Sequence, residues 1–277
     1  PLEERIFFDP YARKFLPNWF YRLGVLITKT GYTELRAPGV MGFLAARERY
    51  IDEILQTSLD EGIEQLVILG AGYDGRAYRF DDLKSGVKVF EVDHPATQRD
   101  KLRRLVKIFG QIPEHVIYVS VDFNTQSLDQ KLFECGFDPS LKTLYIWQGV
   151  TYYLTSEAVD KTLRWIGQTS GPGSKIVFDY IDSSVLEGRQ KHSEVRGMRQ
   201  YQGLTGEGLR FGIPDGSIQT FLESRGFRQV KNTGSDELHR LYCTGKRQER
   251  KVISGYGIAS AVVQTENEPA GRQGKAE

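Results

Sequence analysis

The sequence is poor in the residues that hold metals or cross-link chains. Two cysteines, Cys135 and Cys243, and four histidines occur among its 277 residues. Two cysteines this far apart make no disulfide framework and lack the paired spacing of a zinc site, and they fit a reducing compartment. We therefore expect neither a bound metal nor a fold that depends on disulfides.

Long apolar runs are also missing. No stretch approaches the roughly 20 apolar residues that a membrane-spanning helix needs, and residues 1–5 do not resemble a signal peptide. We therefore expect no membrane partner, and the cytoplasm is the expected location.

Neither sign of charge is in excess. The 37 Lys and Arg residues nearly balance the 36 Asp and Glu residues, whereas nucleic-acid binders usually show a basic excess or stripe. Nucleic acid is therefore not an expected partner. With 39% hydrophobic and 12% aromatic residues, the chain can bury a sizeable core, and its length fits one large domain with elaborations at its ends.

Five short apolar, β-branched segments alternate with segments of helical period. Between them, Leu102, Leu105 and Phe109 follow a helical spacing, and Thr155 can cap a further helix. This alternation predicts an α/β fold: a doubly wound, mostly parallel, Rossmann-like sheet with helices on both faces. The expected strands lie at 66–69, 87–92, 116–121, 144–147 and 176–178.

The ends of the chain and one internal segment are expected to elaborate this sheet. Residues 1–60 are interpreted as an N-terminal helical cap over the ligand edge, and residues 61–263 as the main domain. A polar, glycine-rich stretch at about 182–212 predicts a lid insertion. Beyond a helix led by Pro214, a final antiparallel hairpin and a disordered tail are expected, from strand-like runs at 227–230, 238–243 and 257–263 and from the polar residues 264–277.

A glycine turn follows the first strand directly. Gly70, Ala71 and Gly72 stand where an open α/β sheet binds ligands, and glycine lets a ligand approach the backbone closely. Glu91 and Asp93 end the second strand about 20 residues further on, where an acid can accept hydrogen bonds from a ribose. Together these features predict a nucleoside site, although a Gly-x-Gly alone can be a plain structural turn.

The residues after the turn favour one nucleoside over another. Gly75 would complete a dinucleotide fingerprint, but the carboxylate of Asp74 would repel a pyrophosphate. S-adenosylmethionine carries no phosphate, and its ammonium and sulfonium suit an acidic loop. Arg47 or Arg76 could hold its carboxylate. Asp74 can equally be a helix cap, and the two roles are compatible.

Polar and aromatic residues also follow the third and fourth strands. Asp122 beside Phe123 could bind and stack on an adenine, with a turn acid next to a core ring as the alternative. Gln148, Tyr152 and Tyr153 would face the sulfonium and the incoming substrate, because aromatic faces attract cations. At least one of these tyrosines can instead belong to the core.

Eight segments, in order along most of the chain, carry a resemblance to a known family: 8–12, 46–52, 69–80, 90–93, 121–123, 147–154, 209–213 and 221–227. They resemble the leucine carboxyl methyltransferase superfamily, and within it the bacterial S-adenosylmethionine-dependent O-methyltransferases linked to polyketide and secondary metabolism. Several motifs in the right order are far more specific than the glycine loop alone.

The resemblance implies a role for each matching residue. Arg47 would hold the cofactor carboxylate, and Gly70 and Gly72, with Ala71 between them, would let the methionine portion lie against the backbone. Asp93 would be the ribose acid, and Asp122 with Phe123 the adenine-binding pair.

Three positions depart from the family pattern. Gln148 stands where the family generally has a glutamate that contacts the amino end of the cofactor, so one charge is lost. Glu48 replaces a usual small hydroxyl residue, and Gly75 stands where threonine is common. The first departure could weaken the cofactor or shift substrate preference, whereas the other two remove no expected ligand.

The expected reaction is O-methylation of a carboxyl or hydroxyl group of a small metabolite, polyketide-like or an organic acid. Methyl transfer needs proximity, alignment and exclusion of water more than a strong base. We assign no general base, and His94 and His192 are interpreted as satisfied or solvated. Tyr152, Tyr153 and Tyr201 are the substrate-side candidates. Three alternatives stay open: methylation of a protein C-terminal carboxylate, an NAD(P)-dependent oxidoreductase, and a non-catalytic binding protein.

Overall fold

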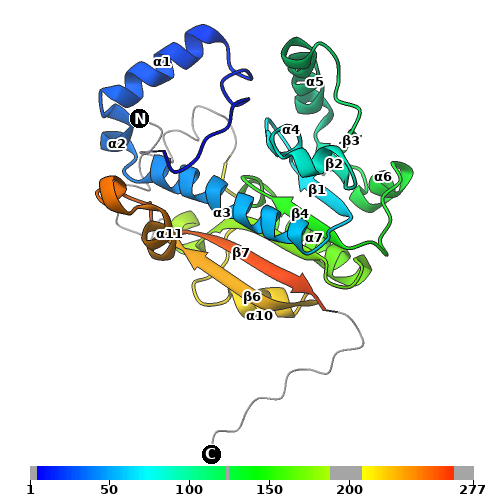
Figure 1. Ribbon diagram of the computed structural model, residues 1–277. Helices are drawn as coiled ribbons and strands as arrows, with labels where there is room; N and C mark the ends of the chain where they lie inside the picture. The colour runs from blue at the N-terminus through cyan, green and yellow to red at the C-terminus, as the bar shows by residue number, and fades with distance from the viewer. Residues whose placement is uncertain (1–4, 123–124, 188–207, 265–277) are drawn as a thin grey trace, which may run out of the picture.

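The computed structural model describes residues 5–122, 125–187 and 208–264, which form a single seven-stranded sheet flanked by helices (Figure 1). The strand order is β3-β2-β1-β4-β5-β7-β6. The first five strands run parallel, and β7 is antiparallel to both of its neighbours. The bounds are β1 (Gln65–Leu69), β2 (Lys88–Asp93), β3 (Val116–Ser120), β4 (Thr143–Trp147), β5 (Lys175–Ile181), β6 (Phe227–Gly234) and β7 (Tyr256–Val263). The predicted fold class is confirmed.

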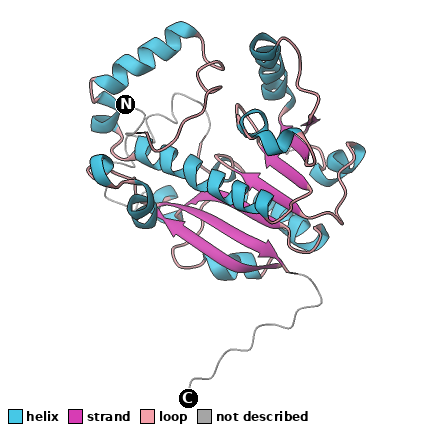
Figure 2. Cartoon of the chain, in the orientation of Figure 1, coloured by secondary structure: helices cyan, strands magenta, loops and turns pink. Residues whose placement is uncertain are grey.

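The sheet is covered on both faces, as Figure 2 shows. Because successive side chains of a strand point to opposite faces, Leu66 and Ile68 of β1 enter one hydrophobic cluster and Val67 and Leu69 enter the other. The first cluster takes side chains from α3 (Val40–Asp60), α4 (Arg76–Arg79), α5 (Pro95–Phe109) and α11 (Ser235–Tyr242), and the second from α6 (Leu128–Glu134), α7 (Ser156–Thr169) and α10 (Ile218–Glu223). Short 3-10 turns are η2 (Asp81–Lys84), η3 (Thr151–Tyr153) and η4 (Gly245–Arg247).

The N-terminal segment divides into a part that packs and a part that does not. Ile6 and Phe15 are buried against the domain. Helices α1 (Asn18–Lys29) and α2 (Tyr32–Arg36) bury no residue, and α1 stands apart from the sheet in Figure 1. Of the predicted cap, residues 1–60, α3 and the residues before α1 therefore pack on the domain, whereas α1 and α2 bury no side chain. No helix in the described part of the chain is long and apolar enough to cross a bilayer.

One predicted strand is wrong. The run 238–243 is predicted to be extended, but residues 238–242 belong to α11, which lies in the chain between the antiparallel strands β6 and β7. Leu238 and Tyr242 are four residues apart and share the buried face of this helix, and Asp236 and Glu237 favour its first turn. The Tyr242 hydroxyl donates to Glu53 of α3 at 2.7 Å. A short apolar run is compatible with the period of a strand or of a helix. Here the helical form is the one that packs on α3.

The predicted lid lies mostly outside the described residues, which stop at 187 and resume at 208. Its described flanks are tied to the sheet. The short helix α8 (Ser183–Leu186) follows β5, and Ile213 forms a parallel bridge with Asp182. The backbone N–H of Arg210 donates to the Tyr152 carbonyl at 2.8 Å. The two described flanks therefore lie beside the carboxyl ends of β4 and β5.

Candidate functional site

The loop from β1 to α4 is tied to the end of β2. The backbone N–H of Gly72 donates to Asp93 Oδ2 at 2.6 Å, and that of His94 donates to Asp93 Oδ1 at 2.7 Å. Burial raises the pKa of Asp93, and these two N–H groups offset the rise only in part. A carboxylate therefore sits at the carboxyl edge of the sheet, next to the glycine turn.

Gly70 and Gly72 both have backbone conformations that favour glycine. Their φ angles are +65° and +44°. A Cβ on Gly70 would lie 2.4 Å from Val150 Cγ2, in the loop that follows β4. A Cβ on Gly72 would meet nothing closer than the Gly70 carbonyl oxygen at 3.8 Å. The turn thus packs tightly on one side and leaves its backbone open on the other.

That open side faces a cavity of about 360 Å³. Its walls come from the N-terminal segment, from α3, from the glycine loop and from the residues after β4. They are Phe7, Asp9, Ala12, Glu48, Ile68, Gly70, Ala71, Gly72, Tyr73, Asp74, Gly75, Arg79, Gln148 and Gly149. Four of the predicted site residues, Gly70, Ala71, Gly72 and Gln148, therefore share one cavity.

A carboxylate and an amide meet in the wall of this cavity. Gln148 Nε2 donates to Glu48 Oε1, although the two residues are 100 positions apart. Gln148 Oε1 is buried and has no hydrogen-bond partner among the described residues. Glu48 Oε2 also pairs with Arg76 at 2.8 Å.

Arg76 cannot be the residue that binds a ligand carboxylate. Its side chain is 1% exposed, and it pairs with Asp52 at 2.9 Å as well as with Glu48 and Asp74. Asp74 Oδ1 also accepts the Arg76 N–H at 2.7 Å, at the start of α4. Burial alone would raise the pKa of Asp74, but Arg76 and Lys101 hold it below its usual value. Asp74 thus lines the cavity as a carboxylate and also accepts a backbone N–H at the start of α4.

Arg47 lies beside the loop that follows β4 and pairs with Asp179, a residue that no sequence motif indicated. Its NH1 is 2.5 Å from Asp179 Oδ2, and Asp179 Oδ1 accepts the Gly149 N–H at 2.6 Å. Burial would lower the pKa of Arg47, but Asp179, Tyr152 and Glu48 outweigh it and raise the pKa. Arg47 Nε is buried without a partner among the described residues, so the charged guanidinium keeps a free donor.

The remaining predicted residues divide in three ways. Asp122 follows β3, where Ser120 pairs with Asp93, so it lies at the same sheet edge. Tyr152 is 8% exposed and belongs to the core, which matches the core alternative; burial and Asp179 raise its pKa well above the usual value. Tyr153 packs against that core, with its ring centroid 4.7 Å from that of Tyr152. Phe123 and Tyr201 lie outside the described residues.

The charges of the cavity fit S-adenosylmethionine better than a dinucleotide. Asp9, Glu48 and Asp74 line it, against one lining guanidinium, that of Arg79. Carboxylates attract an ammonium and a sulfonium and repel a pyrophosphate. The unpartnered Gln148 Oε1 is a further acceptor that an ammonium could satisfy. In the sequence, Glu48 stands out only as a departure from the family pattern. Its helix brings it to the end of β4, where it contacts Gln148.

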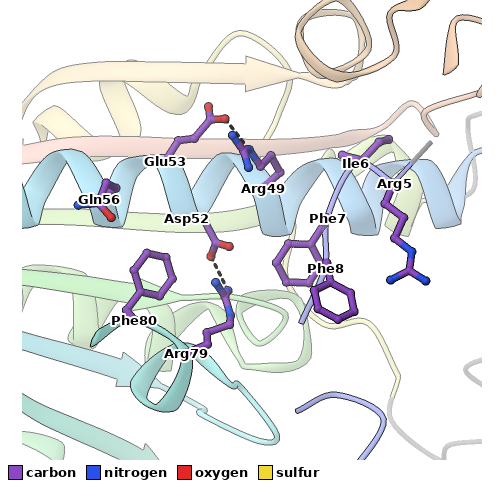
Figure 3. A pocket seen from close by; sticks show the side chains of 10 residues that line it. All are labelled: Arg5, Ile6, Phe7, Phe8, Arg49, Asp52, Glu53, Gln56, Arg79 and Phe80. Carbon is purple, nitrogen blue, oxygen red and sulfur yellow. Dashed lines mark hydrogen bonds and ion pairs between the residues drawn. The ribbon is translucent and has the colours of Figure 1, made fainter. Parts of the chain in front are cut away.

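A second cavity of about 510 Å³ adjoins the first and shares Phe7 and Arg79 with it. Figure 3 shows its aromatic rings and guanidiniums between the N-terminal segment, α3 and the residues after α4. Two of the guanidiniums are paired, Arg49 with Glu53 and Arg79 with Asp52. The lining residues are Arg5, Ile6, Phe7, Phe8, Arg49, Asp52, Glu53, Gln56, Arg79 and Phe80.

Relatives of this chain agree on one cofactor. A Bacillus subtilis (strain 168) protein, YktD, assigned by name to the S-adenosyl-L-methionine-dependent methyltransferases, is 32% identical over 202 residues, which cover 73% of this chain and 66% of that protein. A Mycolicibacterium smegmatis protein of the same description is 38% identical over 143 residues, covering 52% of this chain and 47% of its own length. The chain thus spans between about half and two thirds of these relatives.

A solved structure and a family model both match this chain to methyltransferases. The crystal structure of the CurJ carbon methyltransferase superimposes with a TM-score of 0.51 at 15% identity, over 85% of this chain and 58% of that one. At this identity it shows the fold alone. The family model described as leucine carboxyl methyltransferase matches residues 1–167, and the expected cofactor class is confirmed. The chain therefore belongs to the leucine carboxyl methyltransferase family and has its S-adenosylmethionine-dependent methyltransferase fold.

Proposed function

We propose that this chain is an S-adenosylmethionine-dependent O-methyltransferase that acts on a carboxyl or hydroxyl oxygen of a small organic acid, polyketide-like in its size and apolar character. The observation that carries the proposal is the pair of adjoining cavities, one acidic at the glycine loop and one aromatic and cationic beside it. Their shared walls would place a donor and an acceptor next to each other.

In this proposal the first cavity holds the cofactor. Arg47 binds its carboxylate through the donors that Asp179 leaves free. Gly70 and Gly72, with Ala71, let the methionine portion lie along the backbone, and Asp93 accepts from the ribose hydroxyls. Asp122 with Phe123 would bind the adenine, and Gln148 the amino end.

The protein's part in the reaction is to position the reactants and exclude water. When bound, S-adenosylmethionine would supply a methyl group carried on a sulfonium, and the walls of the two cavities would hold the acceptor oxygen next to it. A carboxylate acceptor is already nucleophilic and needs no base. His94 lies near the site, but it caps α5, where its Nδ1 accepts the Ala96 N–H at 3.2 Å. A phenol or alcohol acceptor would have to lose its proton to another group or to water.

The second cavity would select the acceptor. The Arg5 guanidinium stands 5.0 Å from the centre of the Phe8 ring, and that of Arg79 stands 5.1 Å from the Phe7 ring. Arg79 and Arg49 are paired with Asp52 and Glu53, so Arg5 is the guanidinium proposed to attract an anion, and the rings offer apolar surface to the rest of the molecule. A small acid with an aromatic or polyketide-like body matches both features.

The test is transfer of a labelled methyl group to separate acceptors: aromatic acids, aliphatic acids, phenols, and a peptide that ends in a leucine carboxylate. We expect label in a small acid, as a base-labile ester, or in a phenol, as a stable ether. Arg5→Met should raise the acceptor KM about tenfold, as expected for loss of a charged contact. Phe7→Ala should raise it through loss of apolar surface. Transfer to the peptide alone would replace this proposal with protein carboxyl methylation.

A further inference from the structure

Glu48 lines the cofactor cavity and belongs to a cluster of ion pairs in its wall. Its Oε2 pairs with Arg76, but the same guanidinium also pairs with Asp52 and Asp74. Arg47 NH2 also lies 3.8 Å from Glu48 Oε1, and Arg79 also pairs with Asp52. Three guanidiniums, those of Arg47, Arg76 and Arg79, thus face four carboxylates, those of Glu48, Asp52, Asp74 and Asp179, which leaves a negative excess. Glu48 is also the most exposed of the three carboxylates that pair with Arg76, with 26% of its side chain accessible, against 13% for Asp52 and 11% for Asp74.

The neighbouring amide is held so that its acceptor is left over. Because a carboxylate can only accept, the contact with Glu48 fixes Nε2 of Gln148 on that side. Oε1 of Gln148 must then point away from Glu48, and it is buried without a partner among the described residues. A buried acceptor of this kind normally has a donor, so the arrangement calls for a ligand with N–H groups.

The other acids of the cavity are committed elsewhere. Both oxygens of Asp74 accept from Arg76. Asp9 Oδ1 accepts the N–H groups of Tyr11 and Ala12, at 2.6 and 3.2 Å. Glu48 also accepts from Arg76 and Gln148, but of the three acids it is the one in contact with Gln148. It is therefore the acid best placed to share a cation with the spare acceptor of Gln148.

We infer that Glu48, carried by α3, supplies the carboxylate that binds the ammonium of the cofactor's amino-acid portion, with Gln148 Oε1 as the second acceptor. The charge that is missing at position 148 would thus be provided from a helix instead of from the end of β4. Glu48 and Gln148, which both depart from the family pattern, are hydrogen-bonded to each other. This inference rests on the placement of the cofactor in the proposed function.

The experiment compares two ligands by calorimetry: S-adenosylhomocysteine and the same compound without its α-amino group. For the native chain we expect the amino compound to bind at least about tenfold more tightly, the scale of a hydrogen bond to a charged group. Glu48→Gln should abolish most of this ratio and leave the affinity for the deaminated compound unchanged. The double variant Glu48→Gln with Gln148→Glu, which moves the charge back to the strand, should restore it.

Asp52→Asn is the matched control. It removes another carboxylate from Arg76 but does not line the cofactor cavity, so the ratio of the two affinities should stay that of the native chain. Thermal unfolding of each variant separates loss of the fold from loss of a contact.

Two outcomes would overturn the inference by itself: an unchanged ratio in Glu48→Gln, or an equal loss for both ligands. Binding of neither ligand by the native chain would overturn the cofactor placement and this inference together.

Discussion

Asp93 shows how one side chain can join two parts of the site. Its two oxygens accept the N–H groups of Gly72 and His94, so the carboxylate holds the glycine turn against the end of β2. Burial still raises its pKa. A raised pKa means that the folded chain takes up this proton more readily than the unfolded chain, so stability from this group is gained as the pH falls and lost as it rises.

The same shift predicts an opposite effect on the ligand. Ribose hydroxyls need an acceptor, so affinity for S-adenosylhomocysteine should fall as the pH is lowered through the Asp93 pKa, beginning above the usual range of an aspartate. Titration calorimetry across the mildly acidic range would measure this. Asp93→Asn should bind weakly at every pH and lack this dependence. A native chain with constant affinity down to the ordinary aspartate range would contradict the assignment.

At the scale of elements, β2 and α5 are joined by a buried ion pair. Glu91 of β2 and Lys101 of α5 lie 2.7 Å apart at 1% and 2% exposure, and the Tyr78 hydroxyl donates to Glu91 at 2.9 Å. Glu91, first noted beside Asp93 at the end of the strand, is therefore a structural residue. Burial raises its pKa although Lys101 and Tyr78 oppose the shift.

Removing one partner should be costly. Lys101→Met leaves a buried, unpaired carboxylate, and we expect a loss of about 3–5 kcal/mol in the free energy of unfolding. Because the pKa of Glu91 is raised, the variant should recover stability as the pH falls and Glu91 is protonated. Urea unfolding at two pH values measures both effects. The double variant Glu91→Leu with Lys101→Met should regain most of the loss, because no unpaired charge is then buried.

Arg49→Met is the control: its ion pair with Glu53 is exposed, so its loss should cost little. Equal costs for Lys101→Met and Arg49→Met would refute the argument.

What the sequence could predict differs between elements for a physical reason. The buried parallel strands are continuous apolar runs, and α3 and α5 repeat their apolar residues over several turns, so local patterns suffice. Helix α11 spans only about two turns, which is too short for its periodicity to distinguish a helix from a strand. Asp179 lies within an apolar strand, and its pairing with Arg47 spans 132 positions. Only the folded sheet brings these residues together, so a local pattern cannot identify them.

Over the whole molecule, the site is assembled from parts that are distant in sequence. The N-terminal segment, α3, the glycine loop and the end of β4 all wall one cavity. A ligand in that cavity would link these parts, and a ligand that binds only the folded chain stabilises it as a whole. The expected gain is set by the ligand concentration relative to its dissociation constant.

Thermal unfolding with separate ligands therefore reports on the entire arrangement. At about 100 times its dissociation constant, S-adenosylmethionine or S-adenosylhomocysteine should add roughly 2.7 kcal/mol, which for a chain of this size is a rise of about 5–10 °C in Tm. NAD and NADP should give no shift, since their phosphates would face Asp9, Glu48 and Asp74 in the cavity wall. Asp93→Asn should lose most of the shift, measured from its own Tm without ligand, because an amide keeps only one of the two acceptor oxygens. A rise with NAD or NADP alone would favour the oxidoreductase alternative, because only a site that tolerates a pyrophosphate could produce it.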